Sequence, residues 1–385
     1  MPFFRIKIKT LLLSLFFLTL LASFSLLIVI IYAEHSEHLT TLWSLAILIS
    51  LLLLAIVFAI HTISHSIVHL SREIDEISKL NLENKQKKTF HIAETDLINT
   101  SVDSLRKSLR SFSRYVPQEI AKELMQKKHE ISLAREKKMI SILFTDVTNF
   151  TSLVEIFPLE IINELLTNYF ETLTPVILQS GGTVDKYMGD SIMAIWGAPK
   201  EYPDATTRAC KAALLCQKRL KKLNDDQKRK GLPEFETRMG IKTGNAIVGN
   251  FGTKERMNYS AIGDPVNIAA RLQALNKVYQ TQILIGEETV IKVKEKFLVR
   301  PIETVELRGR KEKIRVYELV AIKEGEKELL PEAWQLKLCS SFTKAFDAYE
   351  KKDEKTAKEL FLLLSQEFPN DHPTSLYLQK LEPSS

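Results

Sequence analysis

Cysteine is scarce in this chain, and neither sign of charge dominates it. The 385 residues include only three cysteines, Cys210, Cys216 and Cys339, whose spacing fits no cysteine-based metal site. Free thiols suit a reducing compartment such as the cytoplasm. The formal net charge is only +6, and part of it flanks apolar segments. We therefore expect affinity for anionic lipid and no nucleic-acid partner.

Long uncharged runs, by contrast, occupy the N-terminal part of the chain. Residues 11–33 form a run of 23 without a charge, and residues 42–60 form a second run of 19. At about 1.5 Å per residue, each run spans or nearly spans a hydrocarbon core of roughly 30 Å. We predict two transmembrane helices. The alternative is a cleaved signal peptide followed by a single anchor.

The flanking charges predict the orientation of these helices. Arg5, Lys7 and Lys9 precede the first run, and lysine and arginine recur after the second. The positive-inside rule then places the N-terminus and the remainder of the chain in the cytoplasm, as a multi-pass protein of the cell (inner) membrane. The short connection AEHSEHLT cannot form a ligand-binding domain, so we expect no separate extracytoplasmic sensor.

Two heptad patterns follow the second run. Their apolar positions alternate at spacings of four and three, first at Ile63, Ile67, Leu70, Ile74 and Ile77 and then at Val102, Leu105, Leu109, Phe112 and Val116. The pattern predicts two helices with a connector between them, which resembles a HAMP linker, and a plain parallel coiled coil is the alternative. Either structure would bring two copies of the chain together.

Two short segments place carboxylates where strands end. The run ILFTDVTNF delivers Asp146 at the carboxyl end of a β-branched strand. The segment DKYMGDSIMAIW is typical of a hairpin, with Asp190 at its tip and able to face Asp146 across neighbouring strands. Two such carboxylates can hold a pair of magnesium ions. Taken singly, each aspartate is more typical of a solvated turn.

A third segment, IGDPVNIAARL, predicts the start of a helix. We expect Asp264 to be its N-cap and Pro265 its first helical residue, so that Asn267 and Arg271 lie four residues apart on one face. An amide and a guanidinium in this arrangement can bind developing charge on a phosphate. Alone, the pair would be ordinary helix surface.

The three segments occur in order over about 130 residues. In this the chain resembles the class III adenylate and guanylate cyclases over roughly residues 115–322. The resemblance implies an α+β catalytic domain with a ferredoxin-like β-α-β-β-α-β core. It also implies that Asp146 and Asp190, helped by the Val147 carbonyl, are metal ligands for two Mg²⁺ ions per site, with Mn²⁺ as the alternative.

The resemblance assigns the remaining site residues as well. Asn267 would orient the ribose, and Arg271 would stabilise the α-phosphate in the transition state. Arg308, in ELRGR, stands where the family usually has a lysine that contacts the nucleotide phosphates. Backbone amides entering a helix are candidates for a phosphate cradle. These amides belong to Asn149, Phe150 and Thr151.

Two further positions predict which base is read. Lys186 and Ser260 occupy the places where the family reads the purine edge. Adenine offers a ring-nitrogen acceptor to the lysine and an amino donor to the hydroxyl, whereas guanine offers a carbonyl and a protonated nitrogen. Adenine is therefore favoured. The alternative for Ser260 is a hydroxyl that pairs with strand backbone.

The implied function is a membrane-bound adenylate cyclase that converts ATP to 3′,5′-cyclic AMP and pyrophosphate. In the family, metal ligands from one protomer meet the Asn/Arg pair of the other. Because the chain has one copy of each motif, we expect a homodimer, formed through the catalytic domain and the linker, with two composite sites. The alternatives are a guanylate cyclase and a catalytically silent nucleotide-binding or scaffolding module.

Patterns along the chain predict four parts. They are a membrane anchor (1–62), a HAMP-like or coiled-coil linker (63–114), the catalytic domain (115–322) and a helical tail (323–385). Within the catalytic part we predict a strand at 138–145, helices at 158–180, 204–230 and 265–276, a hairpin at 182–197, and strands within 235–251. The tail resembles one tetratricopeptide-like helical hairpin, too short for a solenoid, and we expect it to pack on the catalytic domain or its dimer partner.

Overall fold

The computed structural model describes most of the chain after residue 38. The described residues are 16–17, 19–20, 23–24, 26–28, 31, 39–83, 93–113, 115, 135–253, 255–306 and 313–382. Arg308 and most of the predicted first transmembrane segment lie outside them. The chain divides into two compact units, Met1–His129 and Glu130–Ser385.

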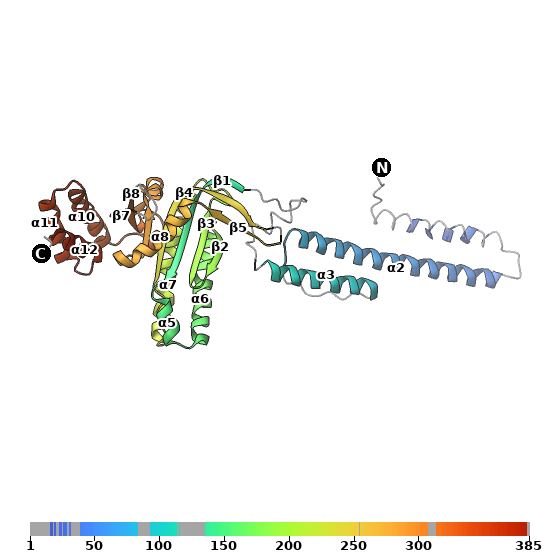
Figure 1. Cartoon of the computed structure of the whole chain (residues 1–385). Helices are drawn as coiled ribbons and strands as arrows, with labels where there is room; N and C mark the ends of the chain where they lie inside the picture. Colours follow the sequence, from blue (N-terminus) through green and yellow to red (C-terminus); the bar gives the residue numbers. More distant parts are fainter. Residues whose placement is uncertain are drawn as a thin grey trace. The chain divides into compact units, whose positions relative to one another are not determined.

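The N-terminal unit contains one long helix and a shorter one beside it (Figure 1). Helix α2 spans Leu39–Ser78 and joins the predicted second membrane segment to the first heptad pattern without a break. Helix α3 spans Ala93–Phe112 and carries part of the second pattern. Within the described residues, one helical stretch, Trp43–Ser78, has the length and apolar composition needed to cross a membrane.

The two linker helices pack through their heptad positions. Leu70 and Ile77 of α2 are buried in one cluster with Val102 of α3. Arg106 of α3 forms an ion pair with Glu73 of α2, and both side chains are largely buried. The heptad residues therefore make an intrachain contact in addition to any contact between copies.

The second unit is built on the predicted ferredoxin-like core. Its four strands lie in the order β2-β3-β1-β4, with β1 antiparallel to both of its neighbours. The strands are β1 (Arg135–Val147), β2 (Thr183–Met188), β3 (Ser191–Trp196) and β4 (Thr237–Gly252). The helices between them are α5 (Phe150–Ile156), α6 (Leu159–Gln179) and α7 (Ala205–Arg229). Helix α5 begins where the backbone amides of Asn149, Phe150 and Thr151 were expected to enter a helix.

Alternation along β1 gives the sheet two apolar faces. Leu143 and Val147 belong to the core cluster that includes residues of α6 and α7. Ile142 and Phe144 belong to a cluster on the other face, where Ala269 of helix α8 (Asp264–Tyr279) packs. Side chains two residues apart in a strand point to the same face, so Asp146 lies on the same face as Ile142 and Phe144. Its carboxylate is therefore on the α8 side of the sheet.

Gly240 explains how closely α8 approaches β4. A Cβ atom at this position would lie 2.2 Å from the backbone nitrogen of Gln273 and 2.3 Å from the carbonyl oxygen of Ala269. Only glycine permits that contact. The N-terminus of α8 differs from the prediction by one residue, because Gly263 is the N-cap and Asp264 is already helical. Pro265 still lies in the first turn, where a proline needs no hydrogen-bond partner.

The sheet continues beyond the core. Strand β5 (Met257–Ile262) pairs with β4 outside the main strand order, and β6 (Ile283–Gly286) runs parallel to β4. Helix α9 (Glu287–Val293) then leads into β7 (Phe297–Glu306) and β8 (Lys313–Ile322), which complete the sheet.

The tail forms three helices that pack on β7 and β8. They are α10 (Ala333–Glu350), α11 (Glu354–Glu367) and α12 (His372–Leu381), and their shared core is aromatic. Buried Arg300 of β7 joins the two parts, because its guanidinium contacts Glu318 of β8 at 2.5 Å and Asp371 at 2.9 Å. The Tyr377 hydroxyl donates to the Ile302 carbonyl at 2.9 Å. The tail thus packs on the catalytic unit of its own chain, which is one of the two expected arrangements, and it adds a third helix, α12, to the predicted helical hairpin.

Candidate active site

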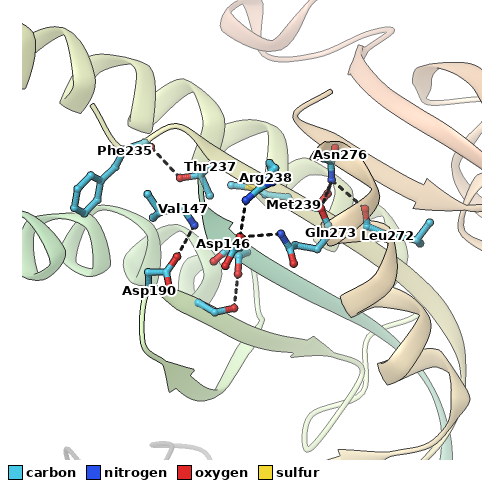
Figure 2. Close-up of polar contacts among 12 residues, drawn as sticks. Asp146, Val147, Asp190, Phe235, Thr237, Arg238, Met239, Leu272, Gln273 and Asn276 are labelled. Carbon is cyan, nitrogen blue, oxygen red and sulfur yellow. Dashed lines mark hydrogen bonds and ion pairs between the residues drawn. The ribbon is translucent and has the colours of Figure 1, made fainter. Parts of the chain in front are cut away.

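Asp146 lies at the end of β1 with two partners from other elements (Figure 2). It sits directly opposite Arg238 in the β1–β4 ladder, and the Arg238 guanidinium contacts its carboxylate at 2.9 Å. The Gln273 side chain of α8 donates to the same carboxylate oxygen at 3.2 Å. Asp146 is therefore held by a cation from the sheet and an amide from the helix that covers it.

Asp190 occupies the turn between β2 and β3, as the hairpin pattern predicted. Its carboxylate accepts a hydrogen bond from the Val147 backbone N–H at 2.8 Å, so the turn is fastened to the end of β1 (Figure 2). Thr145 reinforces this connection, because its hydroxyl accepts from the Ile192 N–H at 3.0 Å and its carbonyl accepts from the Ser191 hydroxyl. These bonds bring the two candidate metal ligands together.

The two carboxylates repel each other. Burial raises the pKa of Asp146, the charge of Asp190 raises it further, and Arg238 acts in the opposite direction. A divalent cation between the two would relieve the repulsion and neutralise both groups. Two converging carboxylates and a nearby backbone carbonyl are the oxygen ligands that Mg²⁺ and Mn²⁺ prefer, so the donor set fits the metals that the family resemblance implies.

Asn267 and Arg271 lie elsewhere on α8. Both are exposed, one helical turn apart, as predicted. Arg271 precedes Gln273 by two residues, which corresponds to a rotation of about 200° around the helix axis. Since Gln273 faces Asp146 of the same chain, Arg271 faces away from it. One chain therefore presents the carboxylates on one side of α8 and a polar pair on another.

The two predicted base-reading residues do meet within one chain. The Lys186 ammonium lies 3.4 Å from the Ser260 hydroxyl, although 74 residues separate them in sequence. Ser260 belongs to β5, opposite Gly249 of β4, and is buried. Its hydroxyl donates to the Asp185 carboxylate at 2.5 Å, so it does not pair with strand backbone.

The predicted phosphate cradle lies at the start of α5. Asn149 is the N-cap and adopts a left-handed conformation with φ of 57°, which asparagine tolerates better than most residues. Phe150 packs edge-on against Phe235, and Thr151 is exposed in the first turn. Arg308, the fourth predicted phosphate contact, lies outside the described residues.

Three residues near these groups were not predicted. Arg238 and Gln273 contact Asp146, and Asp185 contacts Ser260. No local pattern marked Arg238, because it stands among the polar residues Glu236 and Thr237 at the start of β4. Gln273 could not be found from spacing alone, because the close α8–β4 contact decides where it points.

Comparison with known proteins identifies the class. Residues 133–321 match the family described as the adenylate and guanylate cyclase catalytic domain. The chain belongs to this family, the class III cyclases.

Particular relatives are also similar. Adenylate cyclase 1 of Rhizobium meliloti (strain 1021) is 34% identical over 277 residues, which cover 72% of this chain and 42% of the relative. The chain thus spans less than half of that relative's length. The adenylyl cyclase CyaB structure from P. aeruginosa is 31% identical, with 51% of this chain and 100% of that chain covered and a TM-score of 0.48. A bacterial light-regulated adenylyl cyclase structure shares the fold, with a TM-score of 0.54, 22% identity and coverage of 66% and 71%.

Proposed function

We propose that this chain is an adenylate cyclase that converts ATP to 3′,5′-cyclic AMP and pyrophosphate. The proposal places two divalent cations, Mg²⁺ or Mn²⁺, at Asp146, Asp190 and the Val147 carbonyl. When bound, they supply Lewis-acid chemistry that favours ionisation of the ribose 3′-hydroxyl and neutralises the triphosphate. The observation that carries it is the convergence of the two carboxylates at the end of β1, where Asp190 accepts from Val147 at 2.8 Å.

The active unit in this proposal is a homodimer. Asn267 and Arg271 are exposed and turned away from Asp146 of their own chain. A second copy related by a two-fold axis can bring them to the first copy's carboxylates, and symmetry then makes two equivalent sites. Asn267 orients the ribose there, and Arg271 stabilises charge on the α-phosphate as the bond to pyrophosphate breaks.

The triphosphate is held by groups around the carboxylates. The amides of Asn149, Phe150 and Thr151 and the cation of Arg308 contact its oxygens in this proposal. Arg238 adds a cation, because it lies beside Asp146 and is 15% exposed. A divalent ion bound to Asp146 would replace Arg238 as the counter-ion of this carboxylate. The guanidinium could then turn toward a phosphate.

ATP is the proposed substrate in preference to GTP. The Lys186 Nζ and Ser260 Oγ atoms lie 3.4 Å apart. In this proposal the lysine donates to the purine edge and the serine accepts from it. Adenine matches both, whereas guanine matches neither. The guanylate cyclase alternative requires both contacts to be reversed.

Membrane attachment and the linker belong to the same proposal. Apolar side chains such as Leu51, Leu54 and Phe58 of α2 are 62%, 71% and 70% exposed, and a hydrocarbon core would cover them. We place two transmembrane helices at 11–33 and 42–60, with both ends cytoplasmic. A HAMP-like linker at 63–114 then pairs two copies, so that dimer geometry sets the distance between the half-sites.

Mixing two inactive variants tests the composite site. Asp146→Ala destroys the carboxylate half and Asn267→Ala the α8 half, and each full-length variant should form little cyclic AMP alone. Co-expressed with different affinity tags and purified as heterodimers, they should recover up to half of the wild-type rate, because one of their two sites is intact. Equal inactivity of verified heterodimers would contradict sites shared between chains.

The same assay addresses the silent-module alternative. That alternative predicts no cyclic AMP from the wild-type chain with Mg²⁺ or Mn²⁺ and either nucleotide. Formation of cyclic GMP at a rate equal to that of cyclic AMP would instead favour the guanylate cyclase alternative.

A further inference from the structure

Asp185 is a buried carboxylate that the proposed reaction does not use. Its side chain is only 2% exposed, and it lies within β2, the strand that leads to the turn that carries Asp190. A carboxylate taken out of water in this way is unfavourable unless hydrogen bonds and an opposite charge compensate it. Its partners therefore indicate what it does.

Those partners are the base-reading residues. The Ser260 hydroxyl donates to Asp185 at 2.5 Å, and the Lys186 ammonium lies 3.5 Å from the carboxylate. The backbone of Ala261, next to Ser260 in β5, forms a further hydrogen bond with it. Asp185 thus joins β2 to β5 at the place where the purine is read.

A β-bulge makes this arrangement possible. The β2–β3 register pairs Val184 with Ala194 and Lys186 with Met193, so Asp185 is the extra residue. In a regular strand Asp185 and Lys186 would point to opposite faces, but a bulge brings consecutive side chains toward the same side. Both can therefore contact Ser260.

The direction of the Ser260 hydrogen bond has a chemical consequence. A hydroxyl has one proton, and here that proton is committed to Asp185. The oxygen can then only accept at the purine edge. It accepts from the 6-amino group of adenine and opposes the 6-carbonyl of guanine with a lone pair.

We infer that Asp185 is a specificity-determining positioning residue, which fixes the Ser260 hydroxyl as an acceptor and so makes the site select adenine over 6-oxopurines. The inference rests on the proposed function, because that proposal places the purine beside Lys186 and Ser260. It goes further, because it names the side chain that makes the Ser260 hydroxyl an acceptor at the purine edge. Asp185 touches neither metal nor phosphate in this account.

Asp185→Asn is the informative variant because it keeps the size of the side chain. If the amide oxygen accepts from Ala261, the amide nitrogen must donate to Ser260, and the Ser260 proton is then free to face the purine. A hydroxyl that can donate favours a carbonyl over an amino group at the 6-position.

The experiment uses the full-length chain in detergent and compares kcat/KM for ATP, GTP and inosine triphosphate. The wild type should prefer ATP over both 6-oxopurines, and Asp185→Asn should reduce the ATP:GTP ratio about tenfold or more. Asp226→Asn, the same change on the exposed surface of α7, should leave the ratio unchanged. Equal use of ATP and inosine triphosphate by the wild type would overturn the inference without any variant.

A double-mutant cycle separates positioning from general structural damage. If Asp185 acts through the hydroxyl, Ser260→Ala and the double variant Asp185→Asn/Ser260→Ala should have the same ATP:GTP ratio within about twofold. An Asp185→Asn effect of full size in the Ser260→Ala background would overturn the inference, because the hydroxyl would not be the intermediary.

A binding measurement keeps this inference distinct from the proposed activity. Titration with 3′-deoxy-ATP and 3′-deoxy-GTP, which lack the attacking hydroxyl, reports base selection without turnover. A protein that forms no cyclic AMP but binds 3′-deoxy-ATP selectively, in an Asp185-dependent way, would refute the proposed reaction and retain this inference. An active protein whose ratio of 3′-deoxy-ATP to 3′-deoxy-GTP affinity is the same in the wild type and in Asp185→Asn would retain the proposed reaction and refute this inference.

Discussion

The carboxylate half of the site and the α8 half differ in how completely a single chain arranges them. Asp146 is held by Arg238 and Gln273, and Asp190 is fastened to Val147. Asn267 and Arg271, in contrast, lie exposed on the helix surface. The two carboxylates are therefore preorganised within one chain, whereas in the proposed homodimer the Asn/Arg pair would acquire its surroundings from the second copy.

This difference has an energetic reason. Carboxylates that must sit close together are unfavourable, so the chain stabilises them with backbone and side-chain donors before any cation arrives. An exposed amide and guanidinium remain hydrated at little cost until they meet a phosphate. In the proposed homodimer, a change of dimer geometry would move the Asn/Arg pair and leave the contacts of the carboxylate half intact.

The largest expected effect comes from the carboxylate half. Asp146→Asn should lower the rate of cyclic AMP formation about 10³-fold, because one ligand charge for the divalent cations is lost. Dimers should persist in sedimentation analysis, since Asp146 is held within its own chain. The exposed change Asp226→Asn is the matched control and should retain the wild-type rate. Activity of Asp146→Asn within tenfold of wild type would remove Asp146 from the metal site.

The α8 half should show a smaller loss of activity and almost none of stability. Arg271→Ala should lower kcat about 10²-fold, because it removes one stabiliser of transition-state charge. The free energy of unfolding should change by no more than about 0.5 kcal/mol, as for other exposed positions. Lys277→Ala, on the exposed surface near the end of the same helix, should change neither quantity. A thermal shift of many degrees for Arg271→Ala would contradict an exposed role.

The same contrast explains what the sequence could predict. The strand and hairpin patterns around Asp146 and Asp190 placed both carboxylates correctly, since local periodicity decides where a strand ends. The helical spacing likewise placed Asn267 and Arg271 on one face of α8. The predicted helix started one residue late, because the N-cap is Gly263 and not Asp264, and it ended at residue 276, whereas α8 continues to Tyr279.

The contacts that depend on tertiary packing were not predictable in this way. Gln273 reaches Asp146 because Gly240 allows α8 to approach β4, and no local pattern encodes that distance. Asp185 reaches Ser260 through a bulge, which shifts the strand alternation by one residue. The roles of the site residues themselves remain predictions that the experiments above address.

The pH dependence offers an intermediate effect within the carboxylate half. Burial and Asp190 raise the pKa of Asp146 above its usual 3.8, and Arg238 lowers it. Metal binding requires the ionised form, so affinity should fall about tenfold per pH unit below that raised pKa. Arg238→Gln removes the cation that lowers the pKa of Asp146, so the fall in Mn²⁺ affinity on acidification should begin at a higher pH. If the pH at which Mn²⁺ affinity falls is unchanged, Arg238 does not act on Asp146.

The sign for stability is the opposite of the usual aspartate case. Because the folded pKa of Asp146 is raised, the metal-free folded state binds the proton more tightly than the unfolded state does. This group therefore stabilises the protein at pH values below about 3.8 and loses that contribution as pH rises through the raised folded pKa. Asp146→Asn should abolish this part of the pH dependence in metal-free denaturant titrations, whereas Asp226→Asn should leave it unchanged.

The smallest effect belongs to the residue that connects the two halves. Gln273 extends from the helix that carries Asn267 and Arg271, yet its amide donates to Asp146 of its own chain at 3.2 Å. Gln273→Ala removes one neutral donor, worth about 1 kcal/mol, so we expect a loss of up to about fivefold in cyclic AMP formation. Because this hydrogen bond lies within one protomer, mixing with Asp146→Ala chains should not amplify the loss. An effect as large as that of Arg271→Ala would instead indicate that Gln273 contacts the nucleotide across the dimer.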